Sequence, residues 1–333
     1  MVLRGPSVID IAVVSHNARD SIRPCFDSLV RHTRGAAHRI LFFDNASSDG
    51  TPALLRSLAR RRGVEIVLSR RNLGAAGAVN ALRRRLKSEW LVLLDDDARA
   101  TPGWLPGLLR AAASRPGVGI VGCKVTAPGG RIFTAELTPA GTACGHGESD
   151  EGQRDYRRAC ECVAKTCWLM RRSLFSRVGL FDERFFPCQF EDADYCLRAR
   201  LKGFRVLYEG GAAVSHAGLF RIAGPQFARN RKLFERKWLL RPRFPLADSH
   251  PWDRAESEAQ GALRRGDVRG AIARYRLLAR IHPANAEVRS KLGALYFSTG
   301  DFRAARRSLS SALRRSYFPR DLARTLGRLP IPS

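Results

Sequence analysis

Three adjacent carboxylates are the first place in this chain where residue types and spacing suggest chemistry. Asp95, Asp96 and Asp97 directly follow the apolar run 91–94, which is typical of a buried strand. Three neighbouring carboxylates repel one another unless a cation neutralises them. On a strand, Asp95 and Asp97 lie on the same side, so the pair can bind one metal ion together. A polar turn before Thr101 is the alternative interpretation.

Polar residues also end two other predicted strands, and the surrounding pattern predicts where they meet. Ser15-His16-Asn17 follows one strand and Asp44-Asn45 follows the next. Alternating strands and helices of this length predict a mostly parallel sheet covered by helices on both faces. Ligands bind at the carboxyl ends of the strands in such sheets, so we expect the three polar segments to form one site. The predicted strands are 7–14, 39–43, 64–68 and 90–94, and the predicted helices are 19–32, 51–62 and 74–87.

Three weaker signals accompany these strand ends. The Gly-rich loop 71–77 leads into a helix and can present backbone N–H groups to an anion. It is neither G-x-G-x-x-G nor a P-loop, which disfavours both of those nucleotide sites. Glu191 and Asp192 begin a predicted helix, where the helix dipole favours acidic residues for structural reasons alone. His216 ends a short apolar run after the predicted strand 204–208, and a single His is more often structural than a ligand.

The charge balance is strongly basic and allows several anionic partners. Lys and Arg number 58 against 31 Asp and Glu, which gives a net charge of +27. This excess suits nucleotide phosphates, acidic lipid headgroups, nucleic acid or anionic polysaccharide, and it equally suits a solvated basic surface. The Arg residues are dispersed, and no nucleic-acid motif or interleaved aromatic platform is present, so we expect no nucleic-acid partner. A hydrophobic fraction of 44% predicts a folded core.

The chain changes character after about residue 240. Gly266-Asp267 and Gly300-Asp301 are 34 residues apart, and this offset resembles the period of tetratricopeptide repeats. Two repeats are fewer than such a fold usually needs, so we expect them to pack on the first domain or on a last helix at 320–328. The repeats favour contact with a protein partner. The predicted organisation is a first domain at 1–240, a Pro-rich linker at 241–252 and a helical domain at 253–333.

Eight cysteines and the lack of targeting signals predict an intracellular protein with free thiols. The group Cys144, His146, Cys160, Cys162 and Cys167 is considered as a zinc site, but it contains no C-x2-C pair. No stretch approaches the ~20 apolar residues that cross a bilayer. We therefore expect a cytoplasmic location, with or without contact at the inner face of the plasma membrane. The basic segment 226–243, with its interspersed aromatic residues, suits either such contact or closure of the first domain.

Together and in this order, these features resemble the inverting family 2 glycosyltransferases with the GT-A fold. The resemblance covers residues 8–238, and its implied reaction moves a sugar from a nucleoside-diphosphate donor to an acceptor hydroxyl. The implied acceptor is a glycan or a lipid-linked molecule of the cell envelope. The motifs that carry it are 14–17, 44–51, 71–74 with Asn80, 95–97, 179–186, Glu191-Asp192 and His216.

The resemblance also implies a role for each matched residue. Asp192 is the implied general base that accepts the proton of the acceptor hydroxyl. The implied cofactor is a divalent cation, and a His in its ligand set favours Mn²⁺ over Mg²⁺. The implied metal ligands are Asp95, Asp97 and His216; the implied donor contacts are Ser15, Asn17, Asp44, Asn72 and Asp96; the acceptor-side candidates are Glu191 and Trp168.

Two other classes remain open at this point. A repeat-containing adaptor that has lost catalysis would have the same architecture, although it would have no reason to keep Asp95, Asp97, Asp192 and His216 together. A nucleotidyltransferase also uses carboxylate-bound metal, but the G-x-G-x-x-(T/S)-R loop expected early in such a chain is absent.

Overall fold

A computed structural model of the protein describes residues 8–33, 35–137, 143–217, 224–238, 258–259, 261–281 and 286–313. The chain divides into two compact units. The first comprises residues 1–146 and 155–244, and the second comprises 147–154 and 245–333. The predicted linker at 241–252 and the predicted last helix at 320–328 lie outside the described residues.

The first unit is built on a mixed ten-stranded sheet with the order β3-β2-β1-β4-β9-β6-β10-β5, in which β7 pairs with β6 and β8 with β10. The first four strands are parallel, as predicted, whereas β9 runs antiparallel between β4 and β6. The strands are β1 Ile9–Ser15, β2 His38–Asp44, β3 Val64–Leu68, β4 Trp90–Asp95, β5 Ala98–Ala100, β6 Val118–Ala127, β7 Arg131–Thr134, β8 Arg157–Ala159, β9 Cys167–Arg171 and β10 Arg205–His216.

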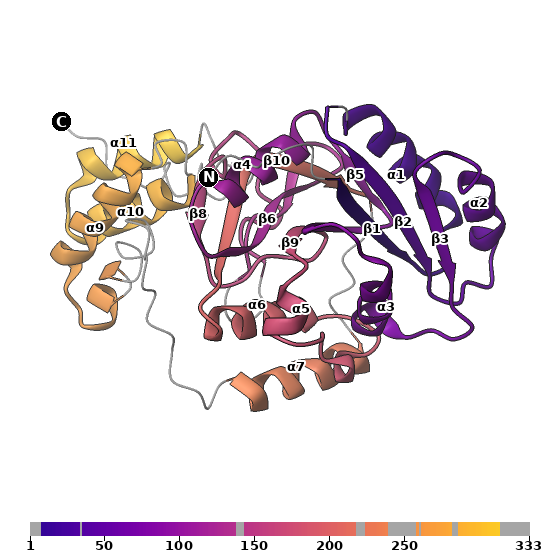
Figure 1. Cartoon of the computed structure of the whole chain (residues 1–333). Coiled ribbons are helices and arrows are strands. Elements are labelled where there is room, and N and C mark those ends of the chain that lie inside the picture. The colour runs from indigo at the N-terminus through magenta and orange to yellow at the C-terminus, as the bar shows by residue number, and fades with distance from the viewer. Residues whose placement is uncertain are drawn as a thin grey trace. The chain divides into compact units, whose positions relative to one another are not determined.

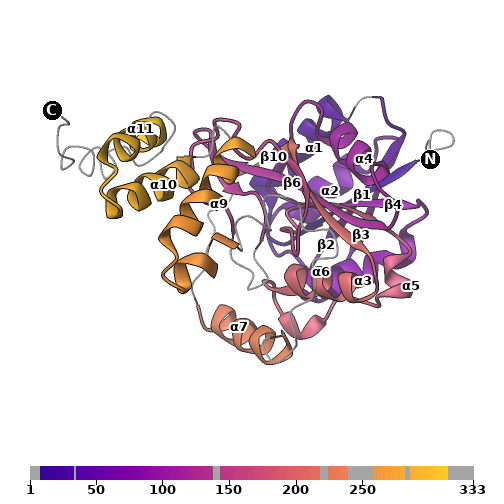
Figure 2. The same cartoon turned by 90° about the vertical axis from the view of Figure 1, so that its left-hand side faces the viewer.

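Helices cover both faces of this sheet (Figures 1 and 2), as the alternation of strands and helices predicts. Helices α1, α2 and α4 pack on one face, and α3, α5, α6 and α7 pack on the other. Their bounds are α1 Arg19–His32, α2 Thr51–Leu58, α3 Gly74–Leu82, α4 Trp104–Ala113, α5 Leu174–Arg177, α6 Glu191–Leu201 and α7 Pro225–Trp238; short 3-10 turns span η1 Arg83–Arg85 and η2 Glu183–Phe185.

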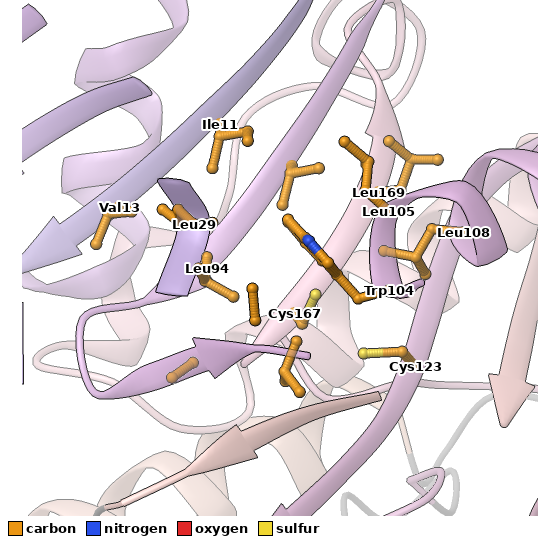
Figure 3. Close-up of a cluster of buried hydrophobic side chains, with 14 of the residues drawn as sticks. Ile11, Val13, Leu29, Leu94, Trp104, Leu105, Leu108, Cys123, Cys167 and Leu169 are labelled. Atoms are coloured by element: carbon orange, nitrogen blue, oxygen red, sulfur yellow. The ribbon is translucent and has the colours of Figure 1, made fainter. Parts of the chain in front are cut away.

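The two-residue period of the strands divides the core between these faces. Ile11 and Val13 of β1 join the α1 side, and Ala12 joins the α3 side. Figure 3 shows the α1 side, where Trp104 lies among aliphatic side chains together with Cys123 and Cys167. Because both faces of the central strands are buried, their sequences are continuous apolar runs rather than alternating ones.

The cysteines are free thiols, and the six buried ones are divided between the two cores. Cys167 belongs to the core on the α1 side, whereas Cys160 and Cys162 belong to the core on the α3 side. A sheet therefore separates members of the group that the sequence analysis considered as a zinc site. No such group is gathered for a metal among the residues that the structure describes.

Three predicted elements differ clearly in their bounds, and the first is the helix predicted at 51–62, which ends at Leu58. The helix predicted to reach residue 87 ends at Leu82, and β10 is one continuous strand where two segments were expected. After Leu82 the chain forms the 3-10 turn η1, and the backbone amides of Lys87 and Ser88 then donate to Asp10 Oδ2 at 2.7 and 3.0 Å instead of continuing a helix. Those amides would otherwise have to bind carbonyls one turn back in the helix.

The helices of the second unit with defined bounds are α9 Val268–Ile281, α10 Ala286–Ser298 and α11 Phe302–Leu313, and residues 261–264 before them are also helical. The 34-residue repeat is visible in its backbone hydrogen bonds. Asp267 N donates to Ala262 O at 2.9 Å, and Asp301 N donates to Tyr296 O at the same distance. The glycines before these two Asp residues both have positive φ, 73° and 79°, a conformation that favours glycine. The predicted repeat is therefore confirmed in the geometry of its turns.

Asp10 is a fully buried carboxylate that ties three segments of the first unit together. Its Oδ1 accepts a hydrogen bond from Arg39 Nε at 2.6 Å, and Arg39 also pairs with Glu65 on β3. Burial alone would raise the pKa of Asp10, but Arg39 and the backbone amides of residues 87 and 88 hold it below its ordinary 3.8. Asp10 thus fixes β1, β2 and the entry to β4 in register.

We predict that Asp10→Ala lowers the free energy of unfolding by about 3–5 kcal/mol, because it removes the buried carboxylate that pairs with Arg39 and leaves only the partly exposed Glu65 as its ion-pair partner. Urea denaturation measures this loss. The depressed pKa means that the contribution of Asp10 is complete above pH 3.8 and disappears as the pH falls through the lower folded-state value. Asp27→Ala is the control: its pair with Arg23 is exposed and is worth at most about 1 kcal/mol. Equal losses in both variants would contradict the prediction.

Candidate active site

A cavity of about 440 Å³ opens in the first unit where the carboxyl ends of β1 and β4 meet the start of α6. This is the edge of the sheet at which the sequence predicts a site, and the volume suits a small-molecule ligand. The lining combines five carboxyl groups with one ammonium, two imidazoles and an apolar wall. The charged and imidazole residues are Asp95, Asp96, Asp97, Glu191, Asp192, Lys165, His146 and His216.

Lys165 neutralises the first carboxylate of the triplet. Its Nζ lies 2.8 Å from Asp95 Oδ1, and the two side chains are 13% and 30% exposed. Strand pairing creates this contact, because Asp95 N donates to Thr166 O at 3.1 Å where β9 runs beside β4. Burial alone would raise the pKa of Asp95 and lower that of Lys165, but their attraction reverses both shifts. Both groups are therefore charged at neutral pH.

Among the described residues, no Lys or Arg forms an ion pair with Asp96. Its Oδ2 accepts a hydrogen bond from His16 N at 3.4 Å. Burial, with the neighbouring charges of Asp95 and Asp97, raises the pKa of Asp96 to about 7. The middle carboxyl of the triplet therefore differs chemically from the first.

Asp97 and His216 lie together, as the sequence analysis expected of two metal ligands. Asp97 Oδ1 is 3.0 Å from His216 Nε2. The pair forms because β5 and β10 are antiparallel, with His216 opposite Ala98. The ring of Phe133 stacks on the His216 ring at a centroid distance of 4.6 Å, which fixes the orientation of the imidazole.

Glu191 and Asp192 occupy the first turn of α6 and face the same cavity. Asp192 Oδ2 accepts from Lys165 N at 3.3 Å, and burial raises its pKa. Glu191 is only 3% exposed, and its Oε2 has no hydrogen-bond partner in the part of the chain that the structure describes. Burial and the adjacent Asp192 raise the pKa of Glu191 to about 8, so Glu191 is protonated at neutral pH. Asp192, rather than Glu191, is therefore the carboxylate that could accept a proton.

The other two polar strand ends form a network beside the cavity. Asn17 Oδ1 accepts from Ser48 N at 2.8 Å, which joins the end of β1 to the loop after β2. Asn45 Nδ2 donates to Asn72 Oδ1 at 2.9 Å, which joins that loop to the Gly-rich segment. Asp44 is 3% exposed, and its Oδ1 has no hydrogen-bond partner among the described residues. A buried acceptor of this kind is costly unless a ligand satisfies it.

Backbone strain is concentrated at these loops. The described residues other than glycine with positive φ are Asn17, Ala46, Gln189 and Phe190, at 52°, 61°, 83° and 71°. All four lie in the segments that follow β1 and β2 or lead into α6. Such conformations cost about 1–3 kcal/mol each and are typical of functional sites. Gly74 is also constrained, because an added Cβ would lie 2.8 Å from Pro187 O in the loop before α6.

The structure brings most of the predicted site residues to one edge but divides them into two groups. Ser15, Asn17, Asp44 and Asn72 belong to the strand-end network, and they do not line the cavity. All the remaining predicted residues except Trp168 line the cavity. Those that line it are Asp95, Asp96, Asp97, Glu191, Asp192 and His216.

Trp168 is the exception, and its predicted place on the acceptor side is wrong. The side chain is completely buried, and its Nε1 donates to Val163 O at 3.1 Å. In the register of β9, Trp168 pairs with Leu93 and faces the core on the α3 side, near Tyr195. Alternation along the strand therefore directs it away from the cavity.

The sequence analysis missed several residues that complete the site. Lys165, Asn45 and Phe133 are the main ones. Asn45 was visible as a polar residue after a strand, but its bridging role depends on loop packing. Lys165 carried no local signal, because its contact with Asp95 depends on the antiparallel pairing of β9 with β4.

A sequence model described as glycosyl transferase family 2 matches residues 10–179, and a tetratricopeptide repeat model matches residues 262–326. The chain belongs to glycosyl transferase family 2.

Its relatives include proteins of polysaccharide biosynthesis in the cell envelope. The chain is 30% identical over 226 residues to the O-antigen biosynthesis protein RfbC of Myxococcus xanthus, covering 64% of this chain and 18% of that protein. It is 28% identical over 204 residues to the N-acetylglucosaminyl-diphospho-decaprenol L-rhamnosyltransferase of Mycobacterium tuberculosis. This match covers 53% of this chain and 66% of that protein. The uncharacterized protein y4gI of Sinorhizobium fredii is 26% identical, and the match covers 64% of this chain and 25% of y4gI. The chain thus spans a quarter or less of two of these relatives.

Solved structures share the fold at low sequence identity. GalNAc-T7 with UDP, GalNAc and Mn²⁺ superposes with a TM-score of 0.59 at 14% identity, covering 70% of this chain and 49% of that one. The mannosyltransferase PcManGT from Pyrobaculum calidifontis, in complex with GDP-Man and Mn²⁺, superposes with a TM-score of 0.55 at 18% identity. The match covers 93% of this chain and 86% of that one. These similarities establish the GT-A fold. No helix in the described ranges has the length and apolar content needed to span a bilayer.

We predict that Glu191→Gln makes the protein more stable relative to the native chain as the pH rises from 5 to 8. Unfolded Glu191 ionises near its ordinary pKa of 4.5, whereas the folded carboxyl keeps its proton to about 8. Between these values the folded state binds more protons, so its stability falls as the pH rises. Gln does not titrate and avoids this loss. Thermal unfolding should show a difference that grows by at least about 2 °C over this range.

The control for this experiment is Glu235→Gln on α7. Glu235 pairs with Arg231 in solvent, and we expect its replacement to give a difference that does not change with pH. A pH-independent difference for Glu191→Gln as well would show that Glu191 is ionised in the folded protein.

Proposed function

We propose that this family 2 enzyme transfers a sugar from a nucleoside diphosphate to an acceptor hydroxyl in cell-envelope glycan synthesis, with inversion at the anomeric carbon. The observation that carries the proposal is the single cavity in which Asp97, His216 and Lys165 face Asp192. One side of this cavity suits a departing diphosphate, and the other suits removal of a proton from an acceptor.

The strand-end network supports binding of the nucleoside part of the donor. Asp44 Oδ1 is a buried acceptor without a hydrogen-bond donor among the described residues. An N–H group of a nucleobase would donate to it. Ser15, Asn17 and Asn72 lie on the same edge and would complete this pocket. The link from His16 N to Asp96 Oδ2 joins the pocket to the cavity and suits Asp96 to a contact with the donor sugar.

The residues present fit a divalent cation bound mainly by one carboxylate and one imidazole. Asp97 and His216 are in contact through the two atoms that would bind it, and Asp95 is the third candidate ligand. Among the described residues no complete group of three ligands is gathered. Metals that meet phosphates commonly take only one or two protein ligands and complete their shell with phosphate oxygens and water. The imidazole favours Mn²⁺ over Mg²⁺.

When bound, such a cation would stabilise the negative charge that develops on the departing diphosphate. Asp192 accepts the proton of the acceptor hydroxyl, and the oxygen attacks the anomeric carbon. The bond from that carbon to the diphosphate breaks as the new glycosidic bond forms on the opposite face. At neutral pH Glu191 is uncharged, so it adds no second negative charge beside Asp192. Its protonated carboxyl group suits a hydrogen bond to the acceptor.

The acceptor class is inferred from the relatives and from the cavity wall. Their printed names concern O-antigen and a decaprenol-linked sugar, which favours a glycan or lipid-linked acceptor. Phe133, Leu137, Phe190 and Phe227 give the cavity an apolar wall suited to the hydrophobic faces of sugars. The basic residues of α7 suit contact with anionic membrane lipids, and the repeats in the second unit suit a protein partner.

We predict that Asp192→Asn lowers kcat by about 10²–10⁴-fold, because an amide cannot accept the proton. Donor binding should change little, since Asp192 lies on the acceptor side. Release of nucleoside diphosphate from a panel of nucleotide sugars with Mn²⁺ measures turnover, and calorimetry measures donor binding. Asp27→Asn, on the exposed face of α1, is the matched control and should retain full activity. Full turnover by Asp192→Asn would exclude Asp192 as the base.

We predict that Asp44→Ala weakens nucleotide binding by roughly tenfold or more, because it removes a charged hydrogen bond in a buried site. Thermal shift with UDP, dTDP and GDP should first identify the nucleotide that stabilises the native chain. The same nucleotide should stabilise Asp44→Ala much less. Glu65→Ala, a partly exposed carboxylate on β3, is the control. If both variants bind equally well, Asp44 does not contact the base.

A further inference from the structure

Lys165 is the single Lys or Arg among the described residues that line the cavity, where it faces five carboxyl groups. Its ammonium contacts Asp95 at 2.8 Å, which is the carboxylate that would otherwise join Asp97 and His216 as a third metal ligand. The pair is largely enclosed, so the attraction between the two charges is only weakly screened by water. A cation at Asp95 would therefore have to compete with this ammonium for the carboxylate charge.

We propose that Lys165 is a positioning residue that competes with the divalent cation for Asp95 and thereby sets the affinity of the metal site. The proposal rests on the metal site described under the proposed function. In the free protein the ammonium contacts Asp95 Oδ1 and offsets its charge, so Asp95 attracts a cation less strongly than a carboxylate without an ammonium beside it. A cation bound by either oxygen of Asp95 would repel the ammonium, because the two positive charges would share one carboxylate.

The geometry gives the ammonium a route that keeps it in the cavity. Lysine has a flexible four-carbon stem, so the charged end can move while the backbone stays fixed. The backbone is held at this point, since Lys165 N donates to Asp192 Oδ2 and Thr166 O accepts from Asp95 N. A displaced ammonium would remain beside the carboxyl groups of Glu191 and Asp192 and face the diphosphate of a bound donor. Occupancy of the metal site and the position of this charge are thus linked.

The test measures Mn²⁺ binding to the full chain by calorimetry, without nucleotide or acceptor. Lys165→Met keeps the length of the side chain but removes the charge, and it frees Asp95. We expect Mn²⁺ to bind this variant at least about tenfold more tightly than the native chain, the order of a charged hydrogen bond. Lys165→Arg keeps the charge and should bind Mn²⁺ within about threefold of the native chain.

A double-mutant cycle separates competition for Asp95 from a general effect of removing a positive charge. In the Asp95→Asn background, Lys165→Met should tighten Mn²⁺ binding by less than about threefold, because there is no carboxylate left to release. Circular dichroism verifies that each variant is folded. Unchanged or weaker Mn²⁺ binding by Lys165→Met would overturn the proposal, and so would equal tightening in both backgrounds or no binding by any variant. Because no sugar transfer enters the assay, its result is independent of whether the proposed reaction is correct.

Discussion

Repulsion among acidic groups is the constraint around which this site is organised. Five carboxyl groups line one cavity, and they are accommodated either by a neighbouring cationic or imidazole group or by a raised pKa. Asp95 contacts an ammonium and Asp97 contacts an imidazole, whereas Glu191 and Asp96 have raised pKa values. Gathering like charges without a ligand costs folding free energy. The same charges are the groups that a cation and a nucleotide sugar require, so the cost is consistent with a binding function.

The sheet supplies the precision that these contacts need. Asp95 ends β4, His216 ends β10, and Lys165 precedes β9, so three strands with different partners converge on the cavity. Groups held at the ends of buried central strands vary little in position, which suits a reaction that depends on alignment. The strained residues lie in the connecting loops, while the strands beneath them form continuous hydrophobic cores.

The two units of the chain are stabilised by different kinds of contact. The first depends on strand pairs far apart in the sequence, such as β1 with β4 and β6 with β10. The second depends on neighbouring helices, and Gly293 shows how closely α10 and α11 approach, because an added Cβ would lie 2.5 Å from Leu309 Cγ. Repeats of this kind are stable through contacts between adjacent helices, and their faces are commonly used for binding. The Gly-Asp turns recur 34 residues apart because each repeat ends a helix in the same way, with a Gly at positive φ followed by an Asp whose N–H bonds to the preceding helix.

The sequence by itself determined the alternation of strands and helices, the 34-residue repeat and the edge at which Asp44 and Asp95 lie. These features are local: hydrophobic period, turn chemistry and the polar residue after a strand are all encoded within short segments. Only the tertiary structure decided that β9 runs antiparallel beside β4, that Trp168 faces the core and that Lys165 contacts Asp95. Strand direction and register depend on the pairing of segments about 70 residues apart, and a one-residue change of register would reverse which side chains face the cavity.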